Sequence, residues 1–239
     1  MSTLFIDERF CGPPDTGNGG YVCGRLAVEM EAPVVEVTLR RPIPLARNLD
    51  VRTAQDAHVV LCDGDAVLAE AKPQDSLDVE TPPIPTYQEA VRAVPRYLGF
   101  RYHSSSNCFV CGPGREQGNG LNIFAGPLDG QEHLVAAPWI PEASLADQCG
   151  QVRPEFIWAA LDCPGAFAIM GQKPKSMVLG RMTTRIDAGV RAGEVCVVFA
   201  WRLSSDGRKQ FAGSALVNGT GRIVGIAKTV WFDVPASAV

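Results

Sequence analysis

The sequence is poor in the residues on which several common enzyme classes depend. It has only three histidines, His58, His103 and His133, in 239 residues. There is no Gly-x-Ser-x-Gly turn either, so a Ser-His-Asp hydrolase is poorly supported. Gly-x-Gly-x-x-Gly and Walker-type loops are also missing, which leaves nucleotide cofactors without a sequence signal.

Long apolar runs and an excess of basic charge are missing too. No run reaches the roughly 18 consecutive apolar residues of a membrane-spanning helix, and Met1–Phe10 lacks the basic and apolar regions of a signal peptide. The net charge of -4 leaves no basic stripe for phosphates, so we expect no nucleic-acid partner. A hydrophobic fraction of 46% is ordinary for a globular chain. These features predict a cytoplasmic protein with no membrane partner.

The eight cysteines are therefore expected to be reduced thiols rather than a disulfide framework. Cys108 and Cys111 have the spacing of metal ligands, but a structural zinc site needs four ligands. No second cysteine pair lies nearby in the sequence, and His103 is the only close addition. We therefore expect packing cysteines and no metal. Cys163 has no histidine placed to activate it as a nucleophile.

A proline-rich stretch between Lys72 and Pro85 divides the chain. It predicts an N-terminal half at 1–75, a connector with a short helix at 76–106, and a C-terminal half at 107–239. In the first half we expect a helix over 21–30 and strands at 4–6, 34–39, 49–54, 57–62 and 66–71. In the second half we expect strands at 121–124, 133–137, 177–186, 194–203, 209–218 and 223–232, with an apolar helix over 156–169.

Both halves end on the same pattern, an Asx-Gly turn followed by an alternating strand that closes in Ala-Lys, at 63–72 and 218–228. A short strand, one helix and several antiparallel strands, present twice, predict an α+β protein. Each half would be a curved antiparallel sheet wrapped around a central helix.

Asp162 is the one carboxylate inside the chain's most continuously apolar helical stretch. Burial of a carboxylate is costly and raises its pKa toward the range useful for proton chemistry. The alternative is that Asp162 caps a short helix beginning at Pro164. The segment alone leaves both interpretations open.

Three stretches resemble the hotdog-fold acyl-CoA thioesterase superfamily, here as a tandem (double) hotdog. They are 107–113 with 120–123, the small-apolar-Asp pattern of 158–162, and the closing strands from 213–217 to 227–228. The resemblance implies an enzyme that hydrolyses an acyl-CoA thioester and that pairs into a homodimer. It also implies no cofactor other than coenzyme A as part of the substrate.

In related single-hotdog thioesterases a His-Gly-Gly or Asn-Gly-Gly turn opens the central helix, and an acid follows about two turns later. The turn's N–H groups polarise the thioester oxygen, while the acid activates water or attacks the carbonyl carbon. In this chain the turn matches Asn18, Gly19 and Gly20, but the acid's position in that half is Ala27.

The second half has the opposite pattern. Asp162 matches the acid, but its turn is Arg153-Pro154-Glu155, where Pro154 has no N–H to donate. We therefore expect one composite site, with Asp162 as general base or nucleophile and the N–H groups of Gly19, Gly20 or Tyr21 as donors. The alternative for Asn18–Gly20 is a plain loop.

Further residues are weaker candidates. Thr183 could position the attacking water, and Tyr21 and Trp158 could contact the substrate. Lys173 and Arg181 could bind the phosphates of coenzyme A. The rival functions are a non-catalytic acyl-CoA or lipid-binding hotdog protein and, less favoured, a hotdog hydratase or dehydratase, since no histidine accompanies Asp162.

Overall fold

A computed structural model describes residues 2–53 and 58–235. Its strands form one antiparallel sheet of eleven within these residues. The strands of the first half are β1 (Ser2–Phe5), β2 (Val34–Leu39), β3 (Asn48–Thr53), β4 (Val59–Asp63) and β5 (Ala66–Pro73). Those of the second half are β6 (Gly126–Leu128), β7 (Gln131–Trp139), β8 (Met177–Ile186), β9 (Cys196–Asp206), β10 (Lys209–Val217) and β11 (Ile223–Asp233).

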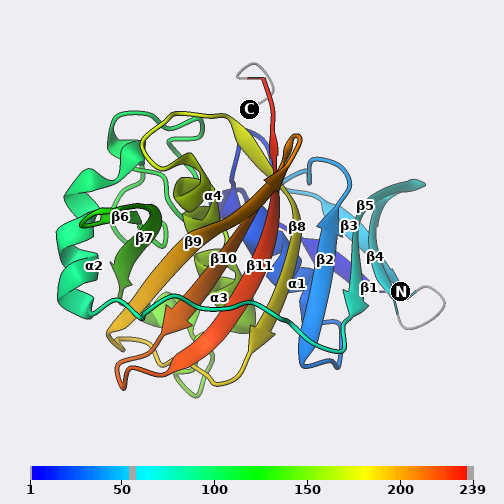
Figure 1. The fold of residues 1–239 in the computed structure, drawn as a ribbon. Coiled ribbons are helices and arrows are strands. Elements are labelled where there is room, and N and C mark those ends of the chain that lie inside the picture. The colour runs from blue at the N-terminus through cyan, green and yellow to red at the C-terminus, as the bar shows by residue number, and fades with distance from the viewer. Residues whose placement is uncertain (1, 54–57, 236–239) are drawn as a thin grey trace.

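The sheet carries the same strand order twice. Its order is β1-β3-β4-β5-β2-β8-β11-β10-β9-β7-β6 (Figure 1). From the outer edge inwards, the first half reads 1-3-4-5-2 and the second reads 6-7-9-10-11-8, so the two orders correspond apart from the edge strand β6. β2 and β8 join the halves in antiparallel register, from Val34 opposite Arg185 to Thr38 opposite Arg181. The chain therefore has the predicted double hotdog fold, with one sheet continuous across both halves.

Three helices line the inner side of the sheet: α1 (Gly19–Ala27), α3 (Pro154–Ala160) and α4 (Cys163–Met170) (Figure 1). α1 and α3 pack closely because α1 has glycines where they meet. A Cβ on Gly24 would lie 2.6 Å from the Cα of Glu155, closer than real Cβ atoms approach. The two small positions, Gly20 and Gly24, bring the helices of the two halves into backbone contact.

The connector covers the other face of the second half. α2 (Tyr87–Ala93) begins with a capping box between Thr86 and Glu89 and packs on β7. Its Ala90 joins a second apolar cluster with Phe199 and Trp201 of β9. Because both faces of β9 are covered, 196–201 is buried throughout. No helix among the described residues has the length and apolar character needed to cross a membrane.

The structure corrects several expected elements. The 121–124 segment is a loop, not a strand; Ile123 N donates to Val110 O, and β6 follows at Gly126–Leu128. The first helix begins at Gly19 and ends at Ala27 rather than spanning 21–30. The apolar stretch 156–169 is not one helix, because it breaks at Leu161 and Asp162. The expected strand ends at Ala54 and Ala57 lie outside the described residues.

Candidate active site

Asp162 lies at the break between α3 and α4. It occupies the position before the first residue of α4, but its side chain makes no capping hydrogen bond. The carboxylate points to the other half of the chain, where its Oδ2 accepts from Gly20 N at 2.9 Å and from Asn18 Nδ2 at 3.1 Å. The side chain is buried, and the structure therefore does not support a capping role.

Asn18 lies on the other side of this contact and makes hydrogen bonds through both ends of its side-chain amide. It caps α1, because its Oδ1 accepts from Tyr21 N at 2.9 Å, while its Nδ2 donates to Asp162. One amide therefore fixes the helix start and the carboxylate together. Gly20 allows the contact, since a Cβ there would lie 2.4 Å from the Cβ of Asp162 and 2.9 Å from Trp158 O.

Burial raises the pKa of Asp162 from 3.8 to about 7, against the opposing effect of the Gly20 N–H and the Asn18 amide. The second carboxylate oxygen, Oδ1, is buried and has no hydrogen-bond partner among the described residues. A carboxyl group whose pKa is near neutrality, and one of whose oxygens has no partner, is suited to accept a proton.

A cavity of about 560 Å³ opens over this carboxylate, a size common for small-molecule sites. Asn18, Gly19 and Asp162 line it together. Much of the remaining wall is apolar, with contributions from Ala166, Phe167, Met170, Met177, Leu179 and Trp231. Three basic residues, Arg40, Arg41 and Lys175, also line it.

The three candidate N–H donors differ in what they already bind. Gly20 N donates to Asp162 and Tyr21 N donates to Asn18. Gly19, the first residue of α1, lines the cavity, and its N–H has no hydrogen-bond acceptor within the described part of the chain. Of the three N–H groups, it is the one without an acceptor there.

The other sequence candidates do not line this cavity in the described residues. The Tyr21 ring stacks on Phe10 at 4.1 Å between centroids, and Trp158 packs on Gly24. Lys173 is exposed in the loop after α4. The Thr183 hydroxyl donates a hydrogen bond to Glu36 Oε2 at 3.3 Å.

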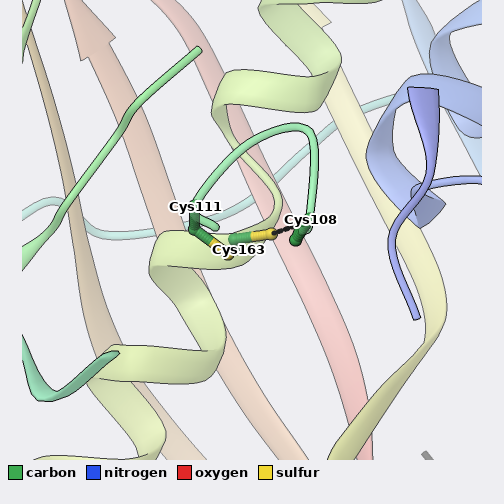
Figure 2. A group of neighbouring side chains, drawn as sticks. All are labelled: Cys108, Cys111 and Cys163. Carbon is green, nitrogen blue, oxygen red and sulfur yellow. Dashed lines mark hydrogen bonds between the residues drawn. The ribbon is translucent and has the colours of Figure 1, made fainter. Parts of the chain in front are cut away.

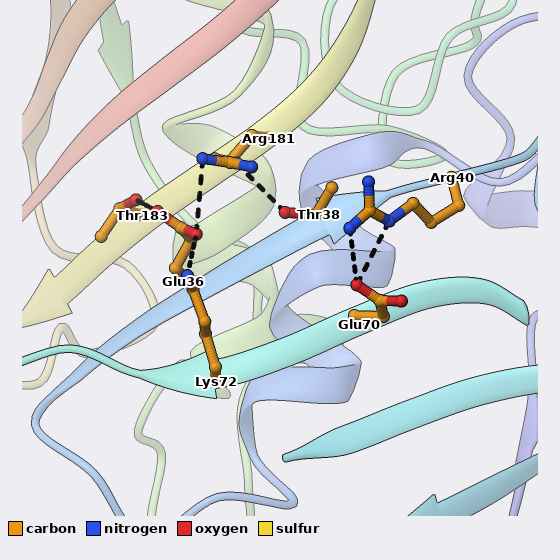
Figure 3. A network of polar contacts seen from close by, with 7 residues as sticks. All are labelled: Glu36, Thr38, Arg40, Glu70, Lys72, Arg181 and Thr183. Atoms are coloured by element: carbon orange, nitrogen blue, oxygen red, sulfur yellow. Dashed lines mark hydrogen bonds and ion pairs between the residues drawn. The ribbon is translucent and has the colours of Figure 1, made fainter. Parts of the chain in front are cut away.

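Arg181 also contacts Glu36, at 3.6 Å, and donates to Thr38 at 3.1 Å. Figure 3 shows these contacts in a polar network across β5, β2 and β8, with the central helices behind the sheet. Arg181 and Thr183 therefore tie the two halves together at their seam.

Sequence reasoning missed the basic residues Arg40 and Arg41 and the 102–105 segment of the connector. Arg40 and Arg41 directly follow β2, and the next loop returns to the α1 start, where Gly17 N donates to Ile43 O. His103, Ser104 and Ser105 reach the cavity from the connector. No local pattern signals either approach, because both depend on tertiary packing.

Comparison with known proteins finds similar structures but no similar sequences. No family model matches the chain, and no curated protein matches it in sequence. Among solved structures, a tesB protein from Mycobacterium avium subspecies paratuberculosis is similar at 15% identity, with a TM-score of 0.62, over 98% of this chain and 92% of that one. A putative thioesterase from Novosphingobium aromaticivorans matches at 12% identity and a TM-score of 0.63, over 98% and 95%.

A third match, with a hot dog fold and unknown function, comes from Alicyclobacillus acidocaldarius at 8% identity and a TM-score of 0.62 over 98% and 92%. At these identities the likeness shows the fold over nearly the whole chain. Function has to be argued from the site.

Proposed function

We propose that the chain hydrolyses acyl-CoA thioesters in the cavity shared by its two halves. The observation that carries the proposal is the pairing of a buried carboxylate, Asp162, with the Asn18–Gly20 helix start of the other half. The apolar and basic parts of the cavity wall fit the two ends of such a substrate. The name of one structural neighbour, the putative thioesterase from Novosphingobium aromaticivorans, agrees with it.

The Gly19 N–H would hold the thioester oxygen. It lies at the start of α1, where unsatisfied N–H groups and the helix dipole favour negative charge. Donors aimed at a developing oxyanion are a major source of rate enhancement in acyl transfer. The donor and the carboxylate come from opposite halves, so each half supplies what the other lacks at Ala27 and Pro154.

Asp162 would take the proton. With Oδ2 held by Gly20 and Asn18, Oδ1 accepts a proton from water as the water oxygen bonds to the carbonyl carbon. The carbon–sulfur bond then breaks, and coenzyme A leaves as a thiolate that recovers the proton. Direct attack by Oδ1 on the carbonyl carbon is the alternative route and requires the same unpartnered oxygen.

Of the three basic residues at the cavity, Arg41 would bind the phosphates of coenzyme A. Arg41 is exposed at the cavity and makes no ion pair among the described residues. Arg40 pairs with Glu70 at 2.8 Å (Figure 3) and Lys175 with Asp233 at 3.4 Å, so both are already held by carboxylates. The apolar wall from α4, β8 and β11 would take the acyl group.

A panel of acyl-CoAs that differ in chain length and in aromatic character tests the proposal. Released coenzyme A is measured by liquid chromatography, since thiol reagents would react with the protein's own cysteines. We expect hydrolysis of at least one class. Saturable binding without any release of coenzyme A would instead indicate the rival acyl-CoA-binding function.

A further inference from the structure

Three buried cysteines from two distant segments meet beside the candidate active site. Cys108 and Cys111 lie in the loop that follows the connector, and Cys163 is the first residue of α4. Their sulfur atoms all lie within 4.8 Å of one another. Figure 2 shows the three side chains converging. The Sγ atoms of Cys108 and Cys163 are 3.7 Å apart.

The 3.7 Å between the sulfurs of Cys108 and Cys163 matches a thiolate metal site. Zinc–sulfur bonds of roughly 2.3 Å in a tetrahedron place two sulfurs roughly 3.8 Å apart. The Cys-x-x-Cys pair offers two such ligands from one loop, and Cys163, 55 residues after Cys108, offers a third. This third candidate ligand comes from α4, which the local sequence did not indicate.

The loop that carries Cys108 and Cys111 makes a tight turn. Gly112 N donates to Cys108 O at 2.9 Å, and a Cβ on Gly112 would lie 2.4 Å from Ser106 O. A glycine is therefore required for this tight turn.

His103 supports the cluster without joining it. Its Nδ1 accepts from Ser105 N at 3.0 Å, so the neutral ring carries its proton on Nε2. Nε2 lies 3.3 Å from Cys111 Sγ and donates to it, as partners of metal-bound thiolates commonly do. Asn18 Nδ2 lies 3.7 Å from the sulfurs of both Cys108 and Cys163.

We propose that Cys108, Cys111 and Cys163 bind one Zn²⁺, with a water as the fourth ligand. All three cysteines line the cavity, which gives that water its access. The ion fastens the loop after the connector to the start of α4, directly beside Asp162. The proposal concerns metal binding alone and stands whether or not the chain hydrolyses acyl-CoA.

Metal content of the full chain, purified without chelators, tests the proposal. Elemental analysis is expected to find about one zinc per chain, and Cys163→Ser and Cys108→Ser are expected to lose most of it. Cys149→Ser is the matched control, because Cys149 is exposed and outside the cluster. Its zinc content should stay at about one.

Cobalt gives a readout that needs no variant. After chelation, titration of the parent chain with Co²⁺ is expected to give the intense visible bands of tetrahedral thiolate coordination, saturating at one equivalent. Three results would overturn the proposal: a metal-free chain without these bands, zinc that survives in folded Cys163→Ser, or a Cys108–Cys163 disulfide detected as the loss of two hydrogens by mass spectrometry.

Discussion

Gly20 donates its backbone N–H to the carboxylate of Asp162 at 2.9 Å, across the interface between the two halves and 142 residues apart in the sequence. The hydrogen bond joins the start of α1 to the break between α3 and α4. It depends on an approach that any side chain at position 20 would block. This contact sets the geometry from which the proposed chemistry follows.

Replacing Gly20 by alanine should therefore damage the site and the fold together. The added Cβ meets backbone and Asp162 at less than 3 Å, so we expect a loss of about 1–3 kcal/mol in the free energy of unfolding. Chemical denaturation measures it. Gly219→Ala is the control, since its Cβ has no neighbour closer than 3.3 Å; equal stability of the two variants would contradict the close approach.

Asp162→Asn should stabilise the protein while it removes activity. The folded-state pKa of about 7 lies above the ordinary value of 3.8, so the buried charge lowers stability as pH rises between these values. The asparagine removes that cost and can still accept from Gly20. We expect the free energy of unfolding to increase by about 1–2 kcal/mol, which corresponds to a rise in Tm of roughly 2–8 °C.

The pH dependence provides the check on this stabilisation. The difference in Tm between Asp162→Asn and the parent should reach its largest value above pH 7, and it should shrink as the pH falls toward 3.8. A difference that is constant with pH, or a variant less stable than the parent at pH 8, would show that the carboxylate is not buried at a cost.

Gly19→Pro removes the one N–H that we assign to the thioester oxygen. Proline is well tolerated at the first position of a helix, and Asn18 already has the extended backbone, with ψ 129°, that precedes proline. We expect kcat to fall by roughly 100-fold or more. Gly19→Ala keeps the N–H and adds a Cβ against Leu179, so it separates crowding from the lost donor. Equal rates for the two variants would exclude this N–H as the donor.

Arg41→Glu should weaken binding of the nucleotide end of the substrate. Loss of a charge-assisted phosphate contact and reversal of its sign should raise KM for acyl-CoA roughly 10-fold. Thioesters of N-acetylcysteamine lack the nucleotide, so their KM should be unchanged. Arg222→Glu, at an exposed hairpin turn, serves as the charge control. A similar rise in KM for both substrate types would place Arg41 away from the phosphates.

The features that could be predicted from the sequence are those that depend on short local patterns. Alternating strands, the repeated Asx-Gly hairpin and the apolar central segments were sufficient to predict a duplicated α+β sheet. The carboxylate and the Asn18–Gly20 turn were also recognisable, because each has a local pattern. Their pairing followed from the resemblance to hotdog thioesterases, whose turn-and-acid pattern is incomplete in each half, at Ala27 and at Pro154. The structure brings Asp162 and Gly20 into direct contact.

The rest depends on tertiary packing. Asp162 and Pro164 offered a helix start as an alternative, and α4 does begin there, at Cys163. The stretch 156–169 was nevertheless predicted as one helix, because a run that is apolar at every position has no periodicity to mark a break. Cys163 meets Cys108 and Cys111 only because α4 starts against the loop after the connector. Arg181 and Thr183 were expected near the substrate, yet their strand aims them at Glu36 across the seam.

The most direct test of the composite site is the steady-state release of coenzyme A by the parent, Asp162→Asn and Asp206→Asn, each shown to be folded, on the best acyl-CoA of the panel. Asp206 is an exposed carboxylate at a hairpin and provides the matched control. We predict that kcat falls at least 100-fold for Asp162→Asn, with substrate binding retained, and stays at the parent value for Asp206→Asn. A folded Asp162→Asn variant that hydrolyses the substrate at the parent rate would contradict the assignment of Asp162.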